Sequence, residues 1–277
     1  DFDTIIVGNK YGPKVTIPSN IKCIYPYSFN YGTQIKEVEF LPDSKLISIG
    51  EYAFCYNKIK SITIPPHVIE IGSSFSFEKV IFEGGSKLSL CEQWHSIKSI
   101  TILSDMRPDI IRLIKIGSQL NEIIVPPENK RYKSLGDLVL YKSKEDSDDF
   151  DALLCAIETS CLATPSNIKY IYPYCFFKSN LQKIEFPDNS ELLSIEEHAF
   201  SSTSIEMITI PPHVTKIGEY AFEKCSKLRH VNFSNDSQLR SIGKYAFSYT
   251  PIETITIPLH VIEIDEYAFE QCSKLRH

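Results

Sequence analysis

Histidine is the side chain of this chain best suited to metal binding or proton transfer, and seven histidines are spread over its 277 residues. His67, His213 and His260 hold the same place in a repeated Pro-x-His-Val phrase, and the last two lie 47 residues apart. Stacked copies of that phrase would place these side chains about 10 Å apart, whereas zinc ligands all lie about 2 Å from the metal. The pattern therefore predicts turn residues and no metal site. His198 stands where other copies have a tyrosine, so we expect it to pack.

Cysteine could supply a nucleophile, a metal site or disulfides, and the chain has eight. No Cys-x-x-Cys motif is present. Cys225 and Cys272 share one phase of the repeat, and two repeats of separation exceed the roughly 7 Å that bridged Cα atoms allow. We expect most of the cysteines to pack as small apolar side chains. Cys155 and Cys161 are the one pair close enough in sequence to consider as a disulfide. Because the cysteines form no clear disulfide framework, they do not indicate whether the protein works in an oxidising or a reducing compartment.

Acidic residues crowd a short segment at 145–151 and could be taken for a calcium loop. The segment lacks the central glycine and the closing glutamate of such a loop, so it is expected to be a solvated turn. No nucleophile-elbow, zinc-protease, phosphate-loop or dinucleotide-binding string is found. The sequence therefore predicts no enzymatic activity, no cofactor and no metal.

The composition also argues against several classes of binding partner. Acidic residues outnumber basic ones by 35 to 29, and this balance argues against nucleic acid and against anionic membrane surfaces. No apolar run is long enough to cross a bilayer, so no direct membrane insertion is expected. The first residues, DFDTIIVGNK, include no initiator Met and no signal-peptide pattern, so we interpret the chain as a piece of a longer protein.

The elements that must position these residues come from an internal repeat of 23 or 24 residues. The segment that starts at Ile205 matches the one that starts at Ile252 at 20 of 26 positions. Each unit opens with apolar-x-x-apolar-x-apolar and a proline, which predicts a short strand followed by a turn. The phrase V-x-x-I-x-x-x-A-F follows, and its apolar spacing of three and four predicts a short helical or 3₁₀ return segment.

Aromatic pairs such as Tyr220 and Phe222 share one phase of the repeat and are expected to stack in the core. One unit of this length cannot bury its own apolar face, so neighbouring units must stack into a solenoid with a parallel sheet on one face.

The pattern L-x-x-I-x-I-P-x-x-V-x-x-I-G-x-x-A-F-x-x-C resembles the BspA-type leucine-rich repeat, a family of cell-surface proteins of mucosal bacteria and parasitic protists. The resemblance covers Val15–Asn129 and Leu162 to the end. It implies an α/β repeat solenoid, a right-handed superhelix of leucine-rich repeats, forming one array over residues 1–277. Residues 131–160 depart from the pattern, and two strand-like runs joined by the acidic segment predict a β-hairpin inserted between coils.

The strand positions that point away from the core would line one extended face, and such faces bind macromolecules because contacts accumulate over many coils. The competing interpretation is that mixed Lys, Glu and Thr side chains simply keep the sheet soluble. The outward positions are Lys36, Glu37, Glu39, Lys60, Ser61, Thr63, Lys98, Ser99, Thr101, Asn121, Glu122, Gln182, Lys183, Glu185, Glu206, Thr209, Arg229, His230, Asn232, Glu253, Thr254 and Thr256.

The resemblance implies a non-enzymatic adhesion or recognition protein, at the cell surface or extracellular, that binds a host or extracellular-matrix macromolecule. The alternative is a structural or intracellular scaffold that acts through protein–protein contacts or self-association. Asn232 and Asn235 are glycosylation acceptors by motif, relevant to a secreted protein.

Overall fold

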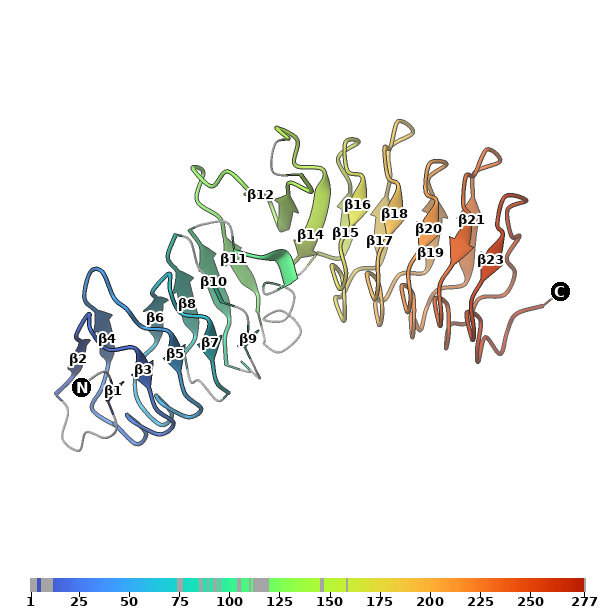
Figure 1. Cartoon of the computed structure of the whole chain (residues 1–277). Coiled ribbons are helices and arrows are strands. Elements are labelled where there is room, and N and C mark those ends of the chain that lie inside the picture. The colour runs from blue at the N-terminus through green and yellow to red at the C-terminus, as the bar shows by residue number, and fades with distance from the viewer. Residues whose placement is uncertain are drawn as a thin grey trace. The chain divides into compact units, whose positions relative to one another are not determined.

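Most repeats of the sequence form one coil that contributes two short strands. The structure, a computed structural model, describes residues 4–5, 12–73, 77–84, 87–88, 90–91, 94, 96–103, 106–109, 111, 120–144, 147–157 and 159–276. The chain divides into an N-terminal unit, Asp1–Arg131, and a C-terminal unit, Tyr132–His277. In each unit the coils stack so that strands of successive repeats lie side by side (Figure 1).

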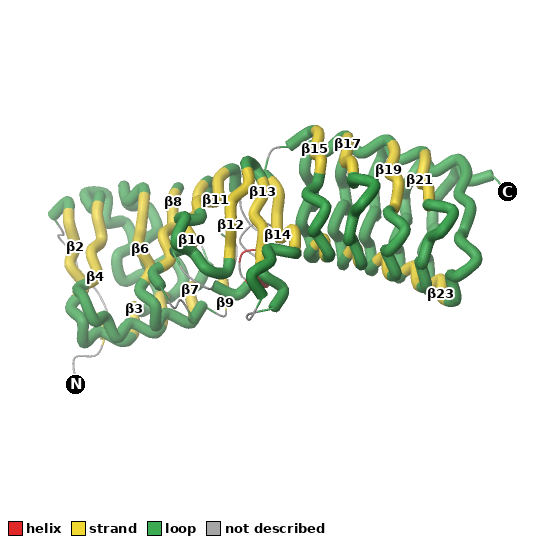
Figure 2. The backbone as a smooth tube through the Cα atoms, turned by 90° about the horizontal axis from the view of Figure 1, so that it is seen from above, coloured by secondary structure: helices red, strands yellow, loops and turns green. Residues whose placement is uncertain are grey.

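The first strand of each coil is the predicted one, formed by the β-branched phrase before the proline. In the N-terminal unit these strands are β2 (Lys14–Ile17), β4 (Glu37–Phe40), β6 (Ser61–Ile64), β8 (Lys79–Phe82), β10 (Ser99–Ile102) and β11 (Glu122–Ile124). In the C-terminal unit they are β15 (Cys161–Ala163), β17 (Lys183–Glu185), β19 (Met207–Ile210) and β21 (His230–Phe233). Seen from above, the first strands of the C-terminal unit form a row along one side of that unit (Figure 2).

The second strand of each coil spans two residues and was not predicted. In the N-terminal unit these strands are β1 (Thr4–Ile5), β3 (Cys23–Ile24), β5 (Ser48–Ile49), β7 (Glu70–Ile71) and β9 (Leu90–Cys91), which form one parallel sheet. In the C-terminal unit they are β16 (Tyr170–Ile171), β18 (Ser194–Ile195), β20 (Lys216–Ile217), β22 (Ser241–Ile242) and β23 (Glu263–Ile264), also parallel.

The return segments are not helical, so the expected α/β class with helical or 3₁₀ returns is wrong. Among the described residues, helix is assigned only at 108–109 and 111. The reason lies in the backbone: Tyr220 and Lys224 have φ values of 54° and 55°, and left-handed residues four positions apart interrupt an α-helix. Their N–H groups instead donate to Lys244 O and Ser248 O of the next coil. Each unit is therefore a parallel β-solenoid whose returns are consecutive turns.

The core of the C-terminal unit is a stack of identical inward positions. Ile208, Ile217, Ala221 and Phe222 are buried in one coil, and their counterparts are buried in the neighbouring coils. Each coil places its apolar residues on those of the next, so burial accumulates along the stack. The regular alternation of buried and exposed residues in β19 follows from the two-residue period of a strand.

Residues 131–160 form antiparallel strands at the start of the C-terminal unit. β12 (Tyr132–Leu135) pairs with β13 (Leu138–Tyr141), and β13 pairs with β14 (Ala152–Ala156). The turn between β12 and β13 contains Gly136 at φ 59°, a conformation that glycine adopts without penalty. β14 then pairs in parallel with β16, which joins the antiparallel strands to the second-strand sheet. β12 is a strand that the sequence interpretation did not include.

Candidate binding surface

The outward positions of the first strands form the surface that the sequence singles out, here called the first-strand face. In β4, Glu37 and Glu39 are exposed while Val38 between them is buried. The same alternation exposes Thr209 in β19 and His230 in β21. Most of the predicted outward residues are exposed in this way, namely Lys36, Glu37, Glu39, Lys60, Ser61, Lys98, Asn121, Glu122, Gln182, Lys183, Glu185, Glu206, Thr209, Arg229, His230, Asn232, Thr254 and Thr256. Thr63 and Glu253 are half-buried.

Ser99 and Thr101 are exceptions, and their prediction as exposed residues is wrong: they are only 8% and 7% exposed. β10 lies between two bonded neighbours, β8 and β11. Ser99 is in register with Lys79 and Glu122, and its hydroxyl donates to Glu122 Oε2 at 2.5 Å. Short side chains between longer ones on both sides are covered by them, which the pattern of a single strand does not reveal.

Some charged residues of the first-strand face are paired with one another. Lys14 Nζ lies 2.9 Å from Glu37 Oε1 and 3.2 Å from Glu39 Oε2, and hydrogen bonding to Glu37 and then Glu39 raises the pKa of this lysine. Lys183 Nζ lies 2.5 Å from Glu185 Oε1. Solvent screens such exposed pairs, so they contribute little to stability. Their main effect is to neutralise and orient charge on this face.

The first-strand ladder is interrupted between β4 and β6 in the N-terminal unit and between β17 and β19 in the C-terminal unit, and only a single bridge, His230 to Thr254, continues it beyond β21. β2 and β4 form one sheet and β6, β8, β10 and β11 another; in the C-terminal unit β15 pairs with β17, and β19 with β21. β4 and β6, and likewise β17 and β19, are not bonded although they belong to successive coils. Paired first strands are 23 residues or fewer apart, whereas both unbonded steps span 24. A first-strand step of 24 residues thus coincides with a missing ladder or, from His230 to Thr254, with a single bridge.

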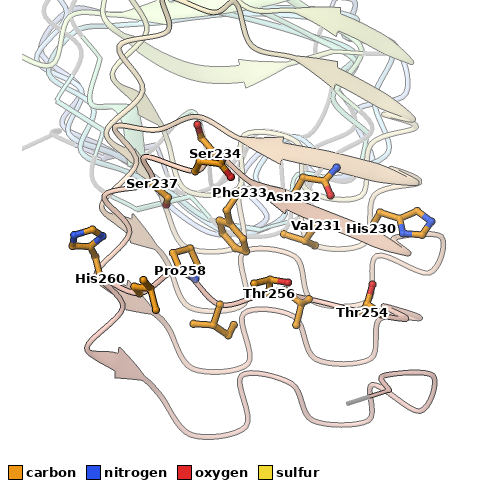
Figure 3. A pocket seen from close by; sticks show the side chains of 14 residues that line it. His230, Val231, Asn232, Phe233, Ser234, Ser237, Thr254, Thr256, Pro258 and His260 are labelled. Atoms are coloured by element: carbon orange, nitrogen blue, oxygen red, sulfur yellow. The ribbon is translucent and has the colours of Figure 1, made fainter.

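Two grooves lie at the 24-residue steps of the C-terminal unit. The β17–β19 groove has a volume of about 620 Å³, and Phe186 and Met207 are among its lining residues. The β21 groove, of about 540 Å³, lies between β21 and residues 254–260, which are joined to β21 by a single bridge, His230 to Thr254. In Figure 3 the Phe233 ring points from β21 towards Pro258 of the next coil. The sequence interpretation missed these grooves, although the repeat lengths carried the signal.

Asn232 and Asn235 are both exposed and both line the β21 groove. A glycan on either side chain would therefore occupy or border this groove. Use of the two acceptor motifs stays a prediction.

The histidines occupy the places that the repeat predicts. His67, His213 and His260 are exposed turn residues. His198 is stacked between Tyr174 at 4.7 Å and Tyr220 at 4.6 Å, and burial lowers its pKa. Within the described ranges, no three His, Cys, Asp or Glu side chains are arranged to hold a metal ion.

The buried cysteine thiols pack and are poorly suited to nucleophilic chemistry. Cys225 Sγ donates to Phe200 O at 3.1 Å and lies 3.3 Å from Thr203 Oγ1, and burial raises its pKa to about 11. A thiol with such a pKa is protonated at neutral pH and is a weak nucleophile. Cys161 is a free, exposed thiol, so it forms no bridge with Cys155, which is buried in β14. The disulfide considered from the sequence is therefore not formed.

The acidic segment is in part structural. Asp151 is buried, and its carboxylate accepts hydrogen bonds from Ser143 N–H at 2.9 Å and from Ser143 Oγ at 2.7 Å. These bonds close the connection between β13 and β14. Glu145 and Asp146 lie outside the described residues. Of the described helical residues, none belongs to a helix long and apolar enough to span a membrane.

Comparison with known proteins matches both the repeat and the fold. The family model for the BspA type leucine-rich repeat region matches residues 9–130 and 152–276, with 6 copies. The crystal structure of the pneumococcal vaccine antigen PcpA aligns with 98% of this chain and 70% of its own, at 21% identity and a TM-score of 0.55. A leucine-rich repeat protein from Eubacterium ventriosum aligns with 96% of this chain and 78% of its own, at 21% identity and a TM-score of 0.59.

Comparison with curated proteins gives no significant match. At 21% identity the two solved structures show a shared fold. Because the family model covers most of the residues and the structure stacks them coil on coil, the chain belongs to the BspA-type leucine-rich repeat family.

Proposed function

We propose that this chain is a non-enzymatic adhesion or recognition protein, displayed at the cell surface or secreted, whose first-strand face binds a host or extracellular-matrix macromolecule. The observation that carries the proposal is the repeated exposure of the same outward positions in coil after coil. A partner that spans several coils gains a contact from each of them, so many weak contacts add up. The name of PcpA, a vaccine antigen, supports display to the exterior.

The composition of the face in the C-terminal unit favours binding over simple solubility. Met207 is 51% exposed on this face, next to the exposed Arg229 and His230 of the neighbouring coil. Methionine and arginine are enriched at protein interfaces, whereas lysine and glutamate alone suffice to keep a sheet soluble. The net charge of −6 favours a protein partner over nucleic acid.

The same proposal covers the organisation of the chain. We treat residues 1–277 as one repeat array, with residues 131–160 inserted between its coils. The 20 identities in 26 positions between the segments at Ile205 and Ile252 support a single repeating unit.

Binding to immobilised extracellular-matrix proteins and to host cells tests the proposal. The double variant Met207→Glu, Arg229→Glu reverses the character of the face without touching a buried residue. The matched control, Lys178→Glu with Gln271→Glu, changes exposed residues of the return turns. We expect saturable binding that the face variant loses and the control keeps.

Three results would count against the proposal. Absence of saturable binding to any matrix protein or host cell would remove the adhesion role. Concentration-dependent self-association, blocked by the face variant, would instead support the scaffold alternative. Protease treatment of intact cells that leaves the protein uncut would contradict surface display.

A further inference from the structure

The two grooves of the C-terminal unit are copies of each other. Phe186 of the β17–β19 groove corresponds to Phe233 of the β21 groove, and Pro211 corresponds to Pro258, each 47 residues later. Each groove therefore has an aromatic ring and a proline ring among its walls. Two corresponding recesses on one face, each with apolar and polar lining residues, would suit a ligand that repeats with the same spacing.

The rise of the solenoid gives that spacing. The rings of Phe200 and Phe222 are 5.0 Å apart and those of Phe222 and Phe247 are 5.1 Å apart, so two coils rise by about 10 Å. A polyproline II helix returns to the same side every three residues, or about 9.3 Å. In an extended strand, side chains on one side recur about every 6.6 Å, or about 13 Å for every second one, and neither distance matches the spacing of about 10 Å between the two grooves.

An α-helix also repeats near this distance, at about 10.5 Å for seven residues, but the groove chemistry disfavours it. β17 and β19 are not bonded to each other, so their facing backbone groups lie along the groove without ladder partners. The hydroxyls of Thr209 and Thr256 lie at equivalent places in the two grooves. A polyproline II backbone keeps its carbonyl groups free to accept from such donors, whereas a helix uses its own internally.

The two grooves differ in charge, and this difference would determine which end of a ligand binds at which groove. The β17–β19 groove carries Asp188 and Asp236 beyond the Lys183–Glu185 pair, and a hydrogen bond from Ser234 lowers the pKa of Asp236. In the β21 groove the counterparts of Glu185 and Asp188 are Asn232 and Asn235. One groove is thus acidic and the other is nearly neutral, so a cationic residue belongs at the first.

We propose that the two grooves together bind a proline-rich segment of a partner in the polyproline II conformation, with prolines three residues apart in successive grooves and an arginine or lysine beside the β17–β19 groove. This inference rests on the proposed function, since it names the chemistry of the partner of the first-strand face. Aromatic rings are the usual platform for proline rings in such recognition.

Fluorescence anisotropy with the whole 277-residue chain tests the inference. The probe is a labelled peptide, Arg followed by Pro-Pro-Ala-Pro-Pro-Ala-Pro-Pro; the control peptide replaces every proline by alanine. We expect saturable binding of the first peptide only. Thr209→Arg and Thr256→Arg, exposed residues at the two grooves, should each weaken binding by about fivefold or more, a loss of roughly 1 kcal/mol. Thr33→Arg, an exposed residue of the N-terminal unit, is the matched control and should leave binding unchanged.

A second comparison tests the direction. Asp188→Asn with Asp236→Asn should weaken the arginine-bearing peptide and leave a peptide with alanine in place of arginine unaffected. Binding of the alanine peptide as tightly as the proline peptide, no saturable binding at all, or equal losses for Thr33→Arg and Thr209→Arg would each overturn the inference. If the proline peptide does not bind while matrix binding persists and depends on Met207 and Arg229, the inference about the grooves is wrong and the proposed function stands. Peptide binding without any matrix or cell binding would overturn the proposed function only.

Discussion

Two columns of aromatic rings run along the return turns of the C-terminal unit and differ in burial more than in spacing. The phenylalanine column, Phe176 to Phe269, has ring centroids 4.9 to 5.4 Å apart, and its inner members are fully buried. The outer column, Tyr174 to Tyr267 with His198 among its rings, has spacings of 4.6 to 5.0 Å and is half-buried or exposed.

The coil repeat sets the spacing of the stacked rings, since both columns follow the same backbone. N–H groups at alternate positions of each turn donate to the next coil, as Tyr220 does to Lys244 O and Phe222 to Ala246 O. These bonds hold the coils at a fixed rise whatever rings they carry. The free energy that a ring contributes to stability then depends on how much apolar surface it removes from water.

The largest effect is expected for Phe222→Ala. This ring is fully buried and stacked on both sides, and its removal leaves a cavity in the core. We expect the free energy of unfolding to fall by about 3–5 kcal/mol, measured by chemical denaturation. A loss no larger than that of an outer-column variant would show that burial does not separate the two columns.

A smaller effect is expected for Tyr220→Ala in the outer column. The Tyr220 ring is stacked on His198 at 4.6 Å and on Tyr245 at 5.0 Å but is only half-buried. Loss of these two ring contacts should lower the free energy of unfolding by about 1–2 kcal/mol. Tyr220→Phe, which keeps the ring, serves as the control and should be close to wild type. A loss as large as that of Phe222→Ala would contradict the distinction.

The backbone beneath the columns can be tested at Ser202, which has a φ of 60°. Left-handed backbone costs a residue with a Cβ atom about 1 kcal/mol relative to glycine. Ser202→Gly should therefore be more stable than Ser202→Ala by up to about 1 kcal/mol in denaturation, the reverse of the order in a helix. If Ser202→Ala were the more stable variant, the result would favour a helical backbone in the return segments.

That helical expectation failed for an identifiable reason. The spacing Val214, Ile217, Ala221, Phe222 is that of a helix face, and apolar periodicity alone does not report backbone handedness. The residues with φ above zero, such as Tyr220 and Lys224, do recur four positions apart in the repeats. They are not glycines, the residues that usually mark a left-handed backbone, so the sequence pattern did not reveal them. In this fold the bonds to the next coil impose the conformation, and they depend on stacked neighbours that a single repeat does not show.

The first-strand face was better predicted because the two-residue period of a strand shows directly which face of the sheet each side chain points to. Glu37, Val38 and Glu39 alternate in the sequence as they do in the structure. Ser99 was misplaced because its exposure depends on the longer side chains in register beside it, Lys79 and Glu122. The grooves were missed because they arise from a missing ladder between coils, which coincides with the 24-residue steps between first strands and not with any one residue type.

The smallest effect concerns His198, the one imidazole in the outer column. Its pKa is lowered chiefly by burial, against the opposing charges of Glu197 and Glu223. Because the folded pKa lies below the unfolded value of 6.5, the unfolded state binds the proton more readily. The stability contributed by the neutral ring is therefore present above about pH 6.5 and is lost as the pH falls through the folded pKa.

We expect the difference in unfolding free energy between wild type and His198→Gln to shift against wild type as the pH is lowered from about 8 to 5, measured by denaturation at each pH. Glutamine does not titrate, so the variant isolates this ring from the carboxylates. The opposite shift would mean that the imidazolium is held by Glu223, whose Oε2 lies 3.9 Å from His198 Nδ1, and by the two stacked tyrosines. In that case the outer column would respond to charge, and the inner column would be the only part of the turn governed by burial alone.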